Sequence, residues 1–147
     1  MRADRRQPFT TPCLCNALRE ASRAVSRLYD EELRAVGLRT TQYSLLRLLA
    51  HAGEARQRDL GELTLLDETT LSRNLRPLVD HGWVSLRAGE DRREKLVAIT
   101  GAGTAKIEEA RPAWERAQER MQSRMPDGDW SGLLAALPDL ARLADEA

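Results

Sequence analysis

The sequence contains few residues of the kinds that mark membrane, secreted or disulfide-bonded proteins. Only two of its 147 residues are cysteines, which excludes a disulfide framework. No apolar run approaches the roughly 18 residues that cross a bilayer, so we expect no transmembrane helix. The opening residues Met-Arg-Ala-Asp-Arg-Arg are charged but have no apolar stretch behind them, which argues against a secretory signal. We therefore expect a cytoplasmic protein.

The chain also lacks an excess of charge of either sign, because 23 basic residues balance 23 acidic ones. A strongly basic chain would have indicated nucleic-acid binding by itself, so any such function has to be argued from motifs. Arginine supplies 21 of the basic residues, and its planar donors suit phosphate and guanine. A GC-rich genome produces the same bias, and composition alone favours that simpler explanation.

Signatures of catalysis are missing as well. The two histidines, His51 and His81, lie at the ends of predicted helices, where surface or capping roles suit them better than catalysis. The chain has no phosphate loop, no metal-ligand cluster and no nucleophile elbow. We therefore expect neither an enzyme nor a bound metal or cofactor.

The chain does have helical periodicity, interrupted by one short strand-like stretch. Hydrophobic residues make up 41% and charged residues 31% of the chain, as in folded domains. Apolar positions recur every three to four residues in most segments, which predicts amphipathic helices. In order, we predict helices at 12–37, 40–53, 57–63 and 68–81, strands at 83–87 and 95–99, a helix from 100 to a turn at 125–128, and a last helix at 130–143.

Particular residues mark the ends and irregularities of these helices. Residues 1–11 are polar and expected to be flexible, with Thr11 as N-cap and Pro12 as the first residue of the first helix. We expect Pro112 to kink the helix that contains it and Pro138 to interrupt the last helix. Thr40 or Thr41 is the expected N-cap of the second helix.

Residues 57–81 have the pattern of a helix-turn-helix, with Asp67 as N-cap of its second helix. That helix keeps its apolar residues on one stripe and crowds hydrogen-bonding groups onto the N-terminal half of its other face. The polar set is Glu68, Thr69, Thr70, Ser72, Arg73, Asn74 and Arg76. Arginine can pair with guanine and asparagine with adenine, so the helix is a candidate for reading bases in a major groove. Taken alone, a merely solvated helix face would look the same.

The predicted hairpin beside that helix favours the DNA-binding interpretation. Its two strands flank a polar turn at 88–94. The basic groups on the hairpin are Arg87, Arg92, Arg93 and Lys95. Four basic groups on one ribbon beside such a helix suit phosphates or an adjoining minor groove. We expect Asp91 to pair with a nearby arginine and to hold the turn or Arg73 in position.

Several motifs occur here in the order and spacing of a known family. The main ones are Leu66-Asp67-Glu68-Thr69-Thr70-Leu71-Ser72-Arg73-Asn74-Leu75-Arg76-Pro77-Leu78, Asp91-Arg92-Arg93, and Leu96-Val97-Ala98-Ile99-Thr100-Gly101-Ala102-Gly103. With them, the stretch from Thr40 to Gly103 resembles the MarR (multiple antibiotic resistance regulator) family of winged-helix repressors. The Asp-Arg-Arg turn, followed by an apolar strand and Thr-x-x-Gly, is the most specific part of the resemblance.

The resemblance implies a mainly α fold: a winged helix-turn-helix with a two-stranded β-wing and N- and C-terminal dimerisation helices. It divides the chain into a flexible N-terminus at 1–11, a helical dimerisation region at 12–37 and 100–147, and a DNA-binding domain at 38–99. It also implies a homodimer on a palindromic operator in double-stranded DNA, with two recognition helices about one helical turn apart.

The resemblance assigns roles within the candidate DNA-binding residues. The candidates are Thr69, Thr70, Ser72, Arg73, Asn74, Arg76, Arg87, Asp91, Arg92 and Arg93. Those expected to face bases are Thr69, Thr70, Ser72 and Arg73. Those expected to face phosphates or the minor groove are Arg76, Arg87, Arg92 and Arg93.

The two cysteines, Cys13 and Cys15, lie in the first turn of the predicted first helix. Unpaired amides and the helix dipole favour a thiolate there, and Arg19, four residues after Cys15, acts in the same direction. Positions two apart diverge by about 200° around a helix, so a bridge between the cysteines would require unwinding. The alternative is that both are small buried hydrophobic residues, the commoner role of free cysteine.

Cys15 and Tyr29 resemble the pattern of the organic hydroperoxide regulators, the thiol-based branch of the MarR family, although Arg19 replaces a tyrosine expected one turn after the cysteine. Cys15 and Tyr29 are about 21 Å apart along one helix, so a contact between them would have to cross the dimer. The sensor candidates are therefore Cys13, Cys15, Arg19 and Tyr29. The sequence leaves open thiol oxidation, a small-molecule inducer in a pocket, or no dedicated sensor.

We interpret the chain as a dimeric, sequence-specific transcriptional repressor that a ligand or thiol oxidation releases from DNA. The competing class is a winged helix used for protein–protein contact. That class draws support from residues 54–97, which contain eight basic and nine acidic residues. A steep salt dependence of DNA affinity would favour the regulator, because phosphate neutralisation releases counterions.

Overall fold

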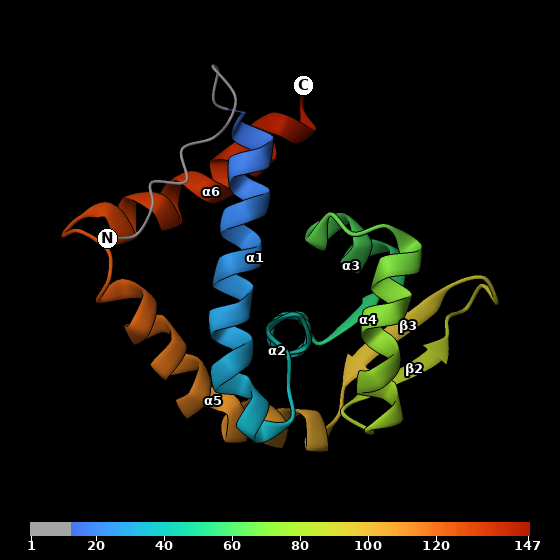
Figure 1. Ribbon diagram of the computed structural model, residues 1–147. Helices are drawn as coiled ribbons and strands as arrows, with labels where there is room; N and C mark the ends of the chain where they lie inside the picture. The colour runs from blue at the N-terminus through green and yellow to red at the C-terminus, as the bar shows by residue number, and fades with distance from the viewer. Residues whose placement is uncertain (1–12) are drawn as a thin grey trace.

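The computed structural model describes residues 13–147 (Figure 1). The expected flexible segment 1–11 and the expected helix start at Thr11 and Pro12 lie outside the described residues. The helices are α1 (Leu14–Leu33), the short 3₁₀ helix η1 (Arg34–Val36), α2 (Thr40–Ala52), α3 (Gln57–Thr64), α4 (Glu68–Asp80), α5 (Gly101–Gln122) and α6 (Asp129–Asp145). The strands are β1 (Glu54–Arg56), β2 (Val84–Ala88) and β3 (Lys95–Ile99). This order confirms the predicted mainly α winged helix-turn-helix.

α1 and α2 begin at other residues than the sequence predicts. α1 begins at Leu14 with Cys13 as its N-cap, and α2 has Arg39, not a threonine, as its N-cap. The Arg39 amide donates to Gln42 Oε1 at 2.9 Å, and the Thr40 amide donates to Asp30 Oδ1 at 2.7 Å. Side chains from α1 and from within α2 therefore satisfy two amides at the start of α2, so no threonine hydroxyl is needed as the N-cap.

The antiparallel sheet has three strands in the order β1-β3-β2, one more than the predicted hairpin. The extra strand β1 pairs Glu54 with Ala98 and Arg56 with Leu96. Three residues are too few to show the alternation that marks a strand in a sequence, which is why β1 escaped prediction. Gly53 makes the turn from α2 into β1 with a φ of +74°, so the strand begins directly at the end of that helix.

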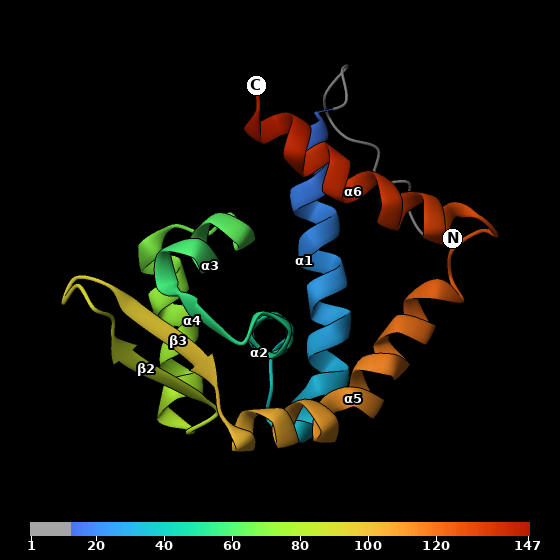
Figure 2. The same cartoon turned by 180° about the vertical axis from the view of Figure 1, so that it is seen from behind.

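The core extends from α1 and α5 to α2, α3, α4 and the sheet, and most of it lies in a compact lobe (residues 38–99). The fully buried side chains of this lobe include Leu46, Leu49, Leu60, Leu71, Leu78 and Val97. α2 occupies the middle of the molecule, between α1 on one side and α4 and the sheet on the other (Figures 1 and 2). This explains the nearly all-round apolar sequence of α2.

A tight junction joins the sheet to α5. The Thr100 hydroxyl donates to the Gly82 carbonyl at 2.6 Å and accepts the Gly103 amide at 3.1 Å. A Cβ on Gly103 would lie 2.1 Å from the carbonyl oxygen of Trp83, so no side chain fits at this position. The Thr-x-x-Gly motif of the sequence therefore fixes how α5 leaves the lobe.

α5 is the scaffold that connects the lobe to α1. The Arg47 guanidinium of α2 lies 4.5 Å from the centre of the Trp114 ring of α5, a cation–π contact. On the α1 side, Glu32 accepts hydrogen bonds from Arg116 at 3.1 Å and from Arg120 at 2.7 Å. α5 changes direction along its length (Figures 1 and 2), which agrees with the kink expected at Pro112.

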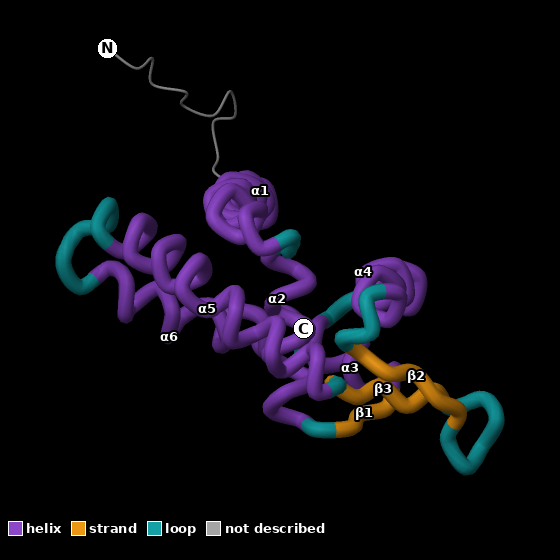
Figure 3. Tube along the Cα trace, turned by 90° about the horizontal axis from the view of Figure 1, so that it is seen from below, coloured by secondary structure: helices purple, strands orange, loops and turns teal. Residues whose placement is uncertain are grey.

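α6 is one continuous helix, so the predicted interruption at Pro138 is wrong. None of its residues is buried, and a carbonyl left without its amide donor by Pro138 can bind water instead. Figure 3 shows α5 extending away from the lobe and α6 running back in the opposite direction. Among residues 13–147, no helix combines the length and apolarity needed to cross a membrane.

Candidate nucleic-acid interface

α4 presents one face to solvent because its other face is buried. Leu71, Leu75 and Leu78 lie in the core, which turns the opposite side of the helix outward. Asp67 caps the helix: its Oδ1 accepts the Thr70 amide at 2.8 Å and its Oδ2 accepts the Thr70 hydroxyl at 2.8 Å. These hydrogen bonds hold the pKa of the Asp67 carboxyl below its usual range. The confirmed cap gives α4 a fixed, exposed N-terminal turn, the part that a recognition helix inserts into a major groove.

The structure divides the predicted base-reading residues into two sets. Those exposed on α4 are Thr69, Ser72, Arg73 and Arg76. Thr70 and Asn74 are half-buried, and the Thr70 hydroxyl is already used by the cap. Among residues 13–147, neither Arg73 nor Arg76 forms an ion pair, so neither guanidinium group has its charge balanced by a described carboxylate.

Ser72 has a partner that the sequence analysis missed. Gln57, the first residue of α3, is buried, and its Nε2 donates to Ser72 Oγ at 2.9 Å. A single glutamine at the start of a short helix shows no periodic signal, so only the packing of α3 on α4 reveals its role. Ser72 thus contributes to the join between the two helices as well as to the exposed face.

The wing, defined here as β2, β3 and the turn between them (residues 84–99), has a turn organised by Asp91. Asp91 Oδ1 accepts the Arg93 amide at 3.0 Å, and the Asp91 carbonyl accepts the Glu94 amide at 2.9 Å. Asp91 therefore binds the main chain of the turn, and the expected pairing with an arginine side chain is not what the structure shows. Arg92 and Arg93 are exposed and form no ion pair with any residue of 13–147.

Arg87 occupies a different position from the turn arginines. Its Nε and Nη2 donate to Oε2 and Oε1 of Glu54 at 2.9 and 2.6 Å, a two-point ion pair from β2 to β1. This pair lowers the pKa of the Glu54 carboxyl and raises that of the Arg87 guanidinium. The sequence predicts Arg87 as a phosphate contact, whereas in the structure Glu54 balances its charge.

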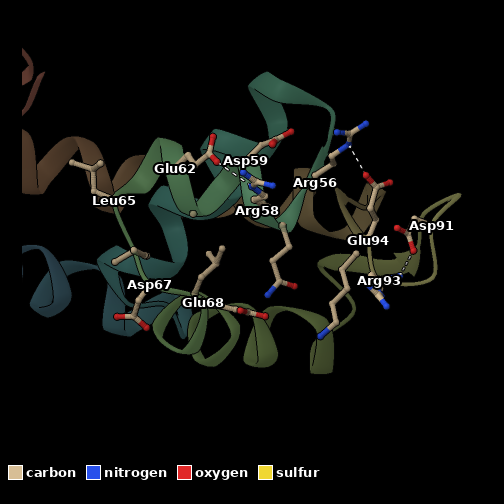
Figure 4. Close-up of a pocket in the computed structure, with 15 residues that line it drawn as sticks. Arg56, Arg58, Asp59, Glu62, Leu65, Asp67, Glu68, Asp91, Arg93 and Glu94 are labelled. Carbon is tan, nitrogen blue, oxygen red and sulfur yellow. Dashed lines mark hydrogen bonds and ion pairs between the residues drawn. The ribbon is translucent and has the colours of Figure 1, made fainter. Parts of the chain in front are cut away.

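A groove of about 900 Å³ lies between α3, the start of α4 and the wing (Figure 4). Its walls carry charges of both signs. Arg93 and Lys95 come from the wing, Glu62 from α3 and Glu68 from α4, and Leu71 is among the apolar residues of the lining. Six of the nine acidic residues of 54–97 line the groove, whereas Arg73, Arg76 and Arg92 lie outside its lining.

The sensor candidates lie apart from this interface. Cys13, Cys15 and Arg19 are exposed at the start of α1, so the alternative of two buried cysteines is wrong for the single chain. Tyr29 is half-buried, its hydroxyl donates to Gln118 of α5, and burial raises the pKa of Tyr29 above its ordinary value. Tyr29 therefore joins α1 to α5 and is not near Cys15. In residues 13–147, no three His, Cys, Asp or Glu residues are grouped as metal ligands.

Comparisons with known proteins agree with this geometry. The family model described as MarR family matches residues 36–94, which include α2, α3, α4, β1, β2 and the turn of the wing. YwoH of Bacillus subtilis (strain 168), described as an uncharacterized HTH-type transcriptional regulator, is 29% identical over 116 residues, or 79% of this chain and 85% of YwoH.

Solved structures show that the similarity extends over nearly the whole chain. The transcriptional regulator MosR of M. tuberculosis, in complex with DNA, has a TM-score of 0.82 and 30% sequence identity, and the match covers 92% of this chain and 98% of MosR. A cysteine-to-serine mutant of MarR from E. coli, complexed with operator DNA, has a TM-score of 0.76 at 22% identity, over 86% of this chain and 92% of that one. The latter likeness shows a shared fold.

Proposed function

Because the chain belongs to the MarR family of transcriptional regulators, we propose that it binds a specific DNA sequence as a homodimer and represses transcription. The observation that carries this proposal is the exposed N-terminal half of α4 beside a wing whose Arg92 and Arg93 have no ion-pair partner among residues 13–147. The DNA complex of MosR supports it, because the two chains share one fold over most of their lengths. Such a protein acts where the chromosome lies, which is the cytoplasm.

In the proposed complex, α4 lies in the major groove. Arg73, exposed and without an ion-pair partner among the described residues, reads a guanine through two hydrogen bonds, and the Thr69 methyl suits a thymine methyl. Arg76, one turn nearer the C-terminus of α4, contacts the phosphate backbone. Arg92 and Arg93 extend the contact from the turn of the wing to the backbone or the minor groove.

A second copy of the chain is the proposed partner of the terminal helices. Large apolar side chains remain exposed on α6 and α1 in the single chain: Leu133, Leu134, Leu137, Leu143, Leu14, Leu18 and Val25. Covering a leucine side chain contributes about 1.5–3 kcal/mol relative to leaving it in water, so several together favour association. Because the same helices would meet in a two-fold dimer, the two α4 helices would bind half-sites of a palindrome about 34 Å apart.

We propose that the signal is a change at the start of α1, where Cys13 and Cys15 are exposed and Arg19 lies one turn from Cys15. A hydroperoxide converts a thiolate to a sulfenic acid and is itself reduced to an alcohol, which adds a polar group at the proposed dimer interface. α1 contacts α5 through Glu32, and α5 contacts α2 through Arg47 and Trp114. A shift of α1 can therefore reach the lobe that carries α4. A small-molecule inducer acting on the same helices is the alternative signal.

The experiment that tests the proposed function is selection of bound fragments from genomic DNA, followed by titration at several salt concentrations. A specific site bound much more tightly than random duplex, with an affinity that falls steeply as salt rises, supports the regulator. Weak, sequence-independent binding would favour the use of the winged helix for protein–protein contact. Repeating the titration with an oxidant and with aromatic acids distinguishes the two proposed signals.

A further inference from the structure

The outer face of the sheet carries two ion pairs that connect β1 to the wing. In the antiparallel register, Glu54 lies opposite Ala98, while Arg56 and Arg87 both lie opposite Leu96. Directly opposed residues share a face, and so do residues two apart, so Glu54, Arg56 and Arg87 all lie on one face of the sheet. Val97, which belongs to the other face, is fully buried in the core. The charged side chains therefore lie on the solvent side.

The first pair crosses the middle strand. The Glu54 carboxylate of β1 reaches over β3 to bind Arg87 of β2 through both oxygens, at 2.9 and 2.6 Å. A two-point pair of this kind fixes the relative orientation of the groups, because both hydrogen bonds must be kept together. β2 pairs with β3 alone, so this contact ties the outer strand of the sheet to β1.

The second pair has the opposite polarity. Arg56 Nε lies 3.4 Å from Glu94 Oε1, at the foot of the turn that carries Arg92 and Arg93. β1 thus contributes a carboxylate that binds Arg87 of β2 and a guanidinium that binds Glu94, next to the start of β3. An isolated two-stranded hairpin is only marginally stable in water, whereas β1 is anchored by Gly53 to the end of α2. The two pairs therefore attach the wing to the rigid part of the lobe.

We propose that Glu54 is a positioning residue for DNA binding, which holds the wing against β1 through Arg87, and that Arg87 serves this contact instead of a phosphate. This inference rests on the proposed function. It assigns the phosphate contacts of the wing to Arg92 and Arg93, which are exposed and unpaired among the described residues. It also explains why an acidic residue lies near the proposed DNA-binding surface. An unpaired carboxylate there would repel the phosphate backbone, whereas the Glu54 carboxylate is paired with Arg87.

The opposite hypothesis makes a prediction of opposite sign. If Glu54 merely competed with DNA for Arg87, then Glu54→Gln would free the guanidinium and strengthen DNA binding. If Glu54 positions the wing, then Glu54→Gln weakens binding, although it removes a negative charge near the phosphates. Electrostatics alone cannot produce a loss of affinity from that substitution, so the direction of the change decides between the two.

The test measures the affinity of the full chain for a selected genomic fragment and for random duplex, at several salt concentrations. We expect Glu54→Gln and Arg87→Gln each to weaken specific binding three- to tenfold with the salt slope unchanged. The charge-swapped double variant, Glu54→Arg with Arg87→Glu, should return to within about twofold of the native affinity. Arg92→Gln is the matched control, and its slope should fall by about one unit, since it removes a phosphate contact.

Hydrogen exchange on the free protein provides a readout that does not depend on DNA. Wing amides should exchange faster in Glu54→Gln than in the native chain and return to native rates in the charge-swapped variant. Tighter DNA binding by Glu54→Gln, a reduced slope for Arg87→Gln, or a swapped variant no better than the single variants would overturn the inference. Failure of the native chain to bind any duplex would refute the proposed function instead, and the exchange rates would still decide whether Glu54 holds the wing against β1.

Discussion

Gln57 Nε2 donates a hydrogen bond of 2.9 Å to Ser72 Oγ and so joins the first residue of α3 to the exposed half of α4. Gln57 is the one buried polar residue found within 13–147, and the contact lies where the two helices of the helix-turn-helix meet. A buried polar group has to be paired, so this bond selects one register of α3 on α4 among those that apolar packing alone would allow. The relationship makes Ser72 part of the support of the recognition helix.

Removal of this hydrogen bond should destabilise the lobe and weaken DNA binding. Ser72→Ala leaves the Gln57 amide without its partner, and we expect a loss of about 1–3 kcal/mol in the free energy of unfolding. Urea denaturation of the single variants and of Ser72→Ala with Gln57→Leu tests this. The double variant replaces both partners by apolar groups and should recover part of the loss. Additive losses in the double variant would show that the two side chains are not coupled.

Base reading by Arg73 predicts a loss that depends on sequence. Arg73→Ala should cost about 1–3 kcal/mol on the specific site and relax the preference at one operator position, because it removes two hydrogen bonds to a base edge. Arg76→Ala is the matched control on the same helix, and it should weaken specific and random DNA alike. Equal losses on both duplexes for Arg73→Ala would reject base reading by this residue.

The turn of the wing predicts a loss that depends on salt. Changing Arg92 and Arg93 to alanine should weaken binding to all sequences and reduce the slope of log affinity against log salt by about one unit per lost phosphate contact. Fluorescence anisotropy at four or more salt concentrations measures this slope. A native slope in the double variant would mean that the turn does not touch the backbone.

The apolar face of α6 predicts dependence of DNA binding on dimerisation. Leu137→Glu places a charge on the apolar stripe, so we expect monomers in sedimentation and a loss of operator affinity of about 100-fold, because the second half-site no longer binds intramolecularly. Ala135→Glu adds the same charge about 160° away around the helix and serves as the control. A dimer that survives Leu137→Glu would place the interface elsewhere.

Thiol chemistry at Cys15 predicts oxidant-dependent release from DNA. Cumene hydroperoxide should release the native protein from its operator, while Cys15→Ser should remain bound, because no sulfenic acid can then form at the exposed start of α1. Cys13→Ser should matter less, since Cys13 lies at the N-cap, outside the helix and without an arginine one turn away. Undiminished binding by the oxidised native protein would eliminate thiol sensing and favour a small-molecule inducer.

Local signals in the sequence predicted most of the fold. The Asp67 cap, the apolar stripe of α4 and the change of period at the wing each depend on neighbouring residues only. The sequence-based predictions were wrong where the start or the interruption of a helix depends on its surroundings in the fold. The Asp30 carboxylate of α1 binds the first amide of α2, and exposure to water lets α6 continue through Pro138. Neither effect leaves a trace in the local sequence.

The sequence by itself determined which residues could bind DNA, because helical periodicity and capping already place Arg73 on the open face of a capped helix and Arg92 on a polar turn. Only the tertiary structure decided which of these groups are available. It showed Arg87 paired with Glu54, residues 33 positions apart, and Ser72 held by Gln57. The physical reason is that local periodicity and capping predict which residues share one face of a helix, whereas the partner of a charge depends on which segments the fold brings within hydrogen-bonding distance.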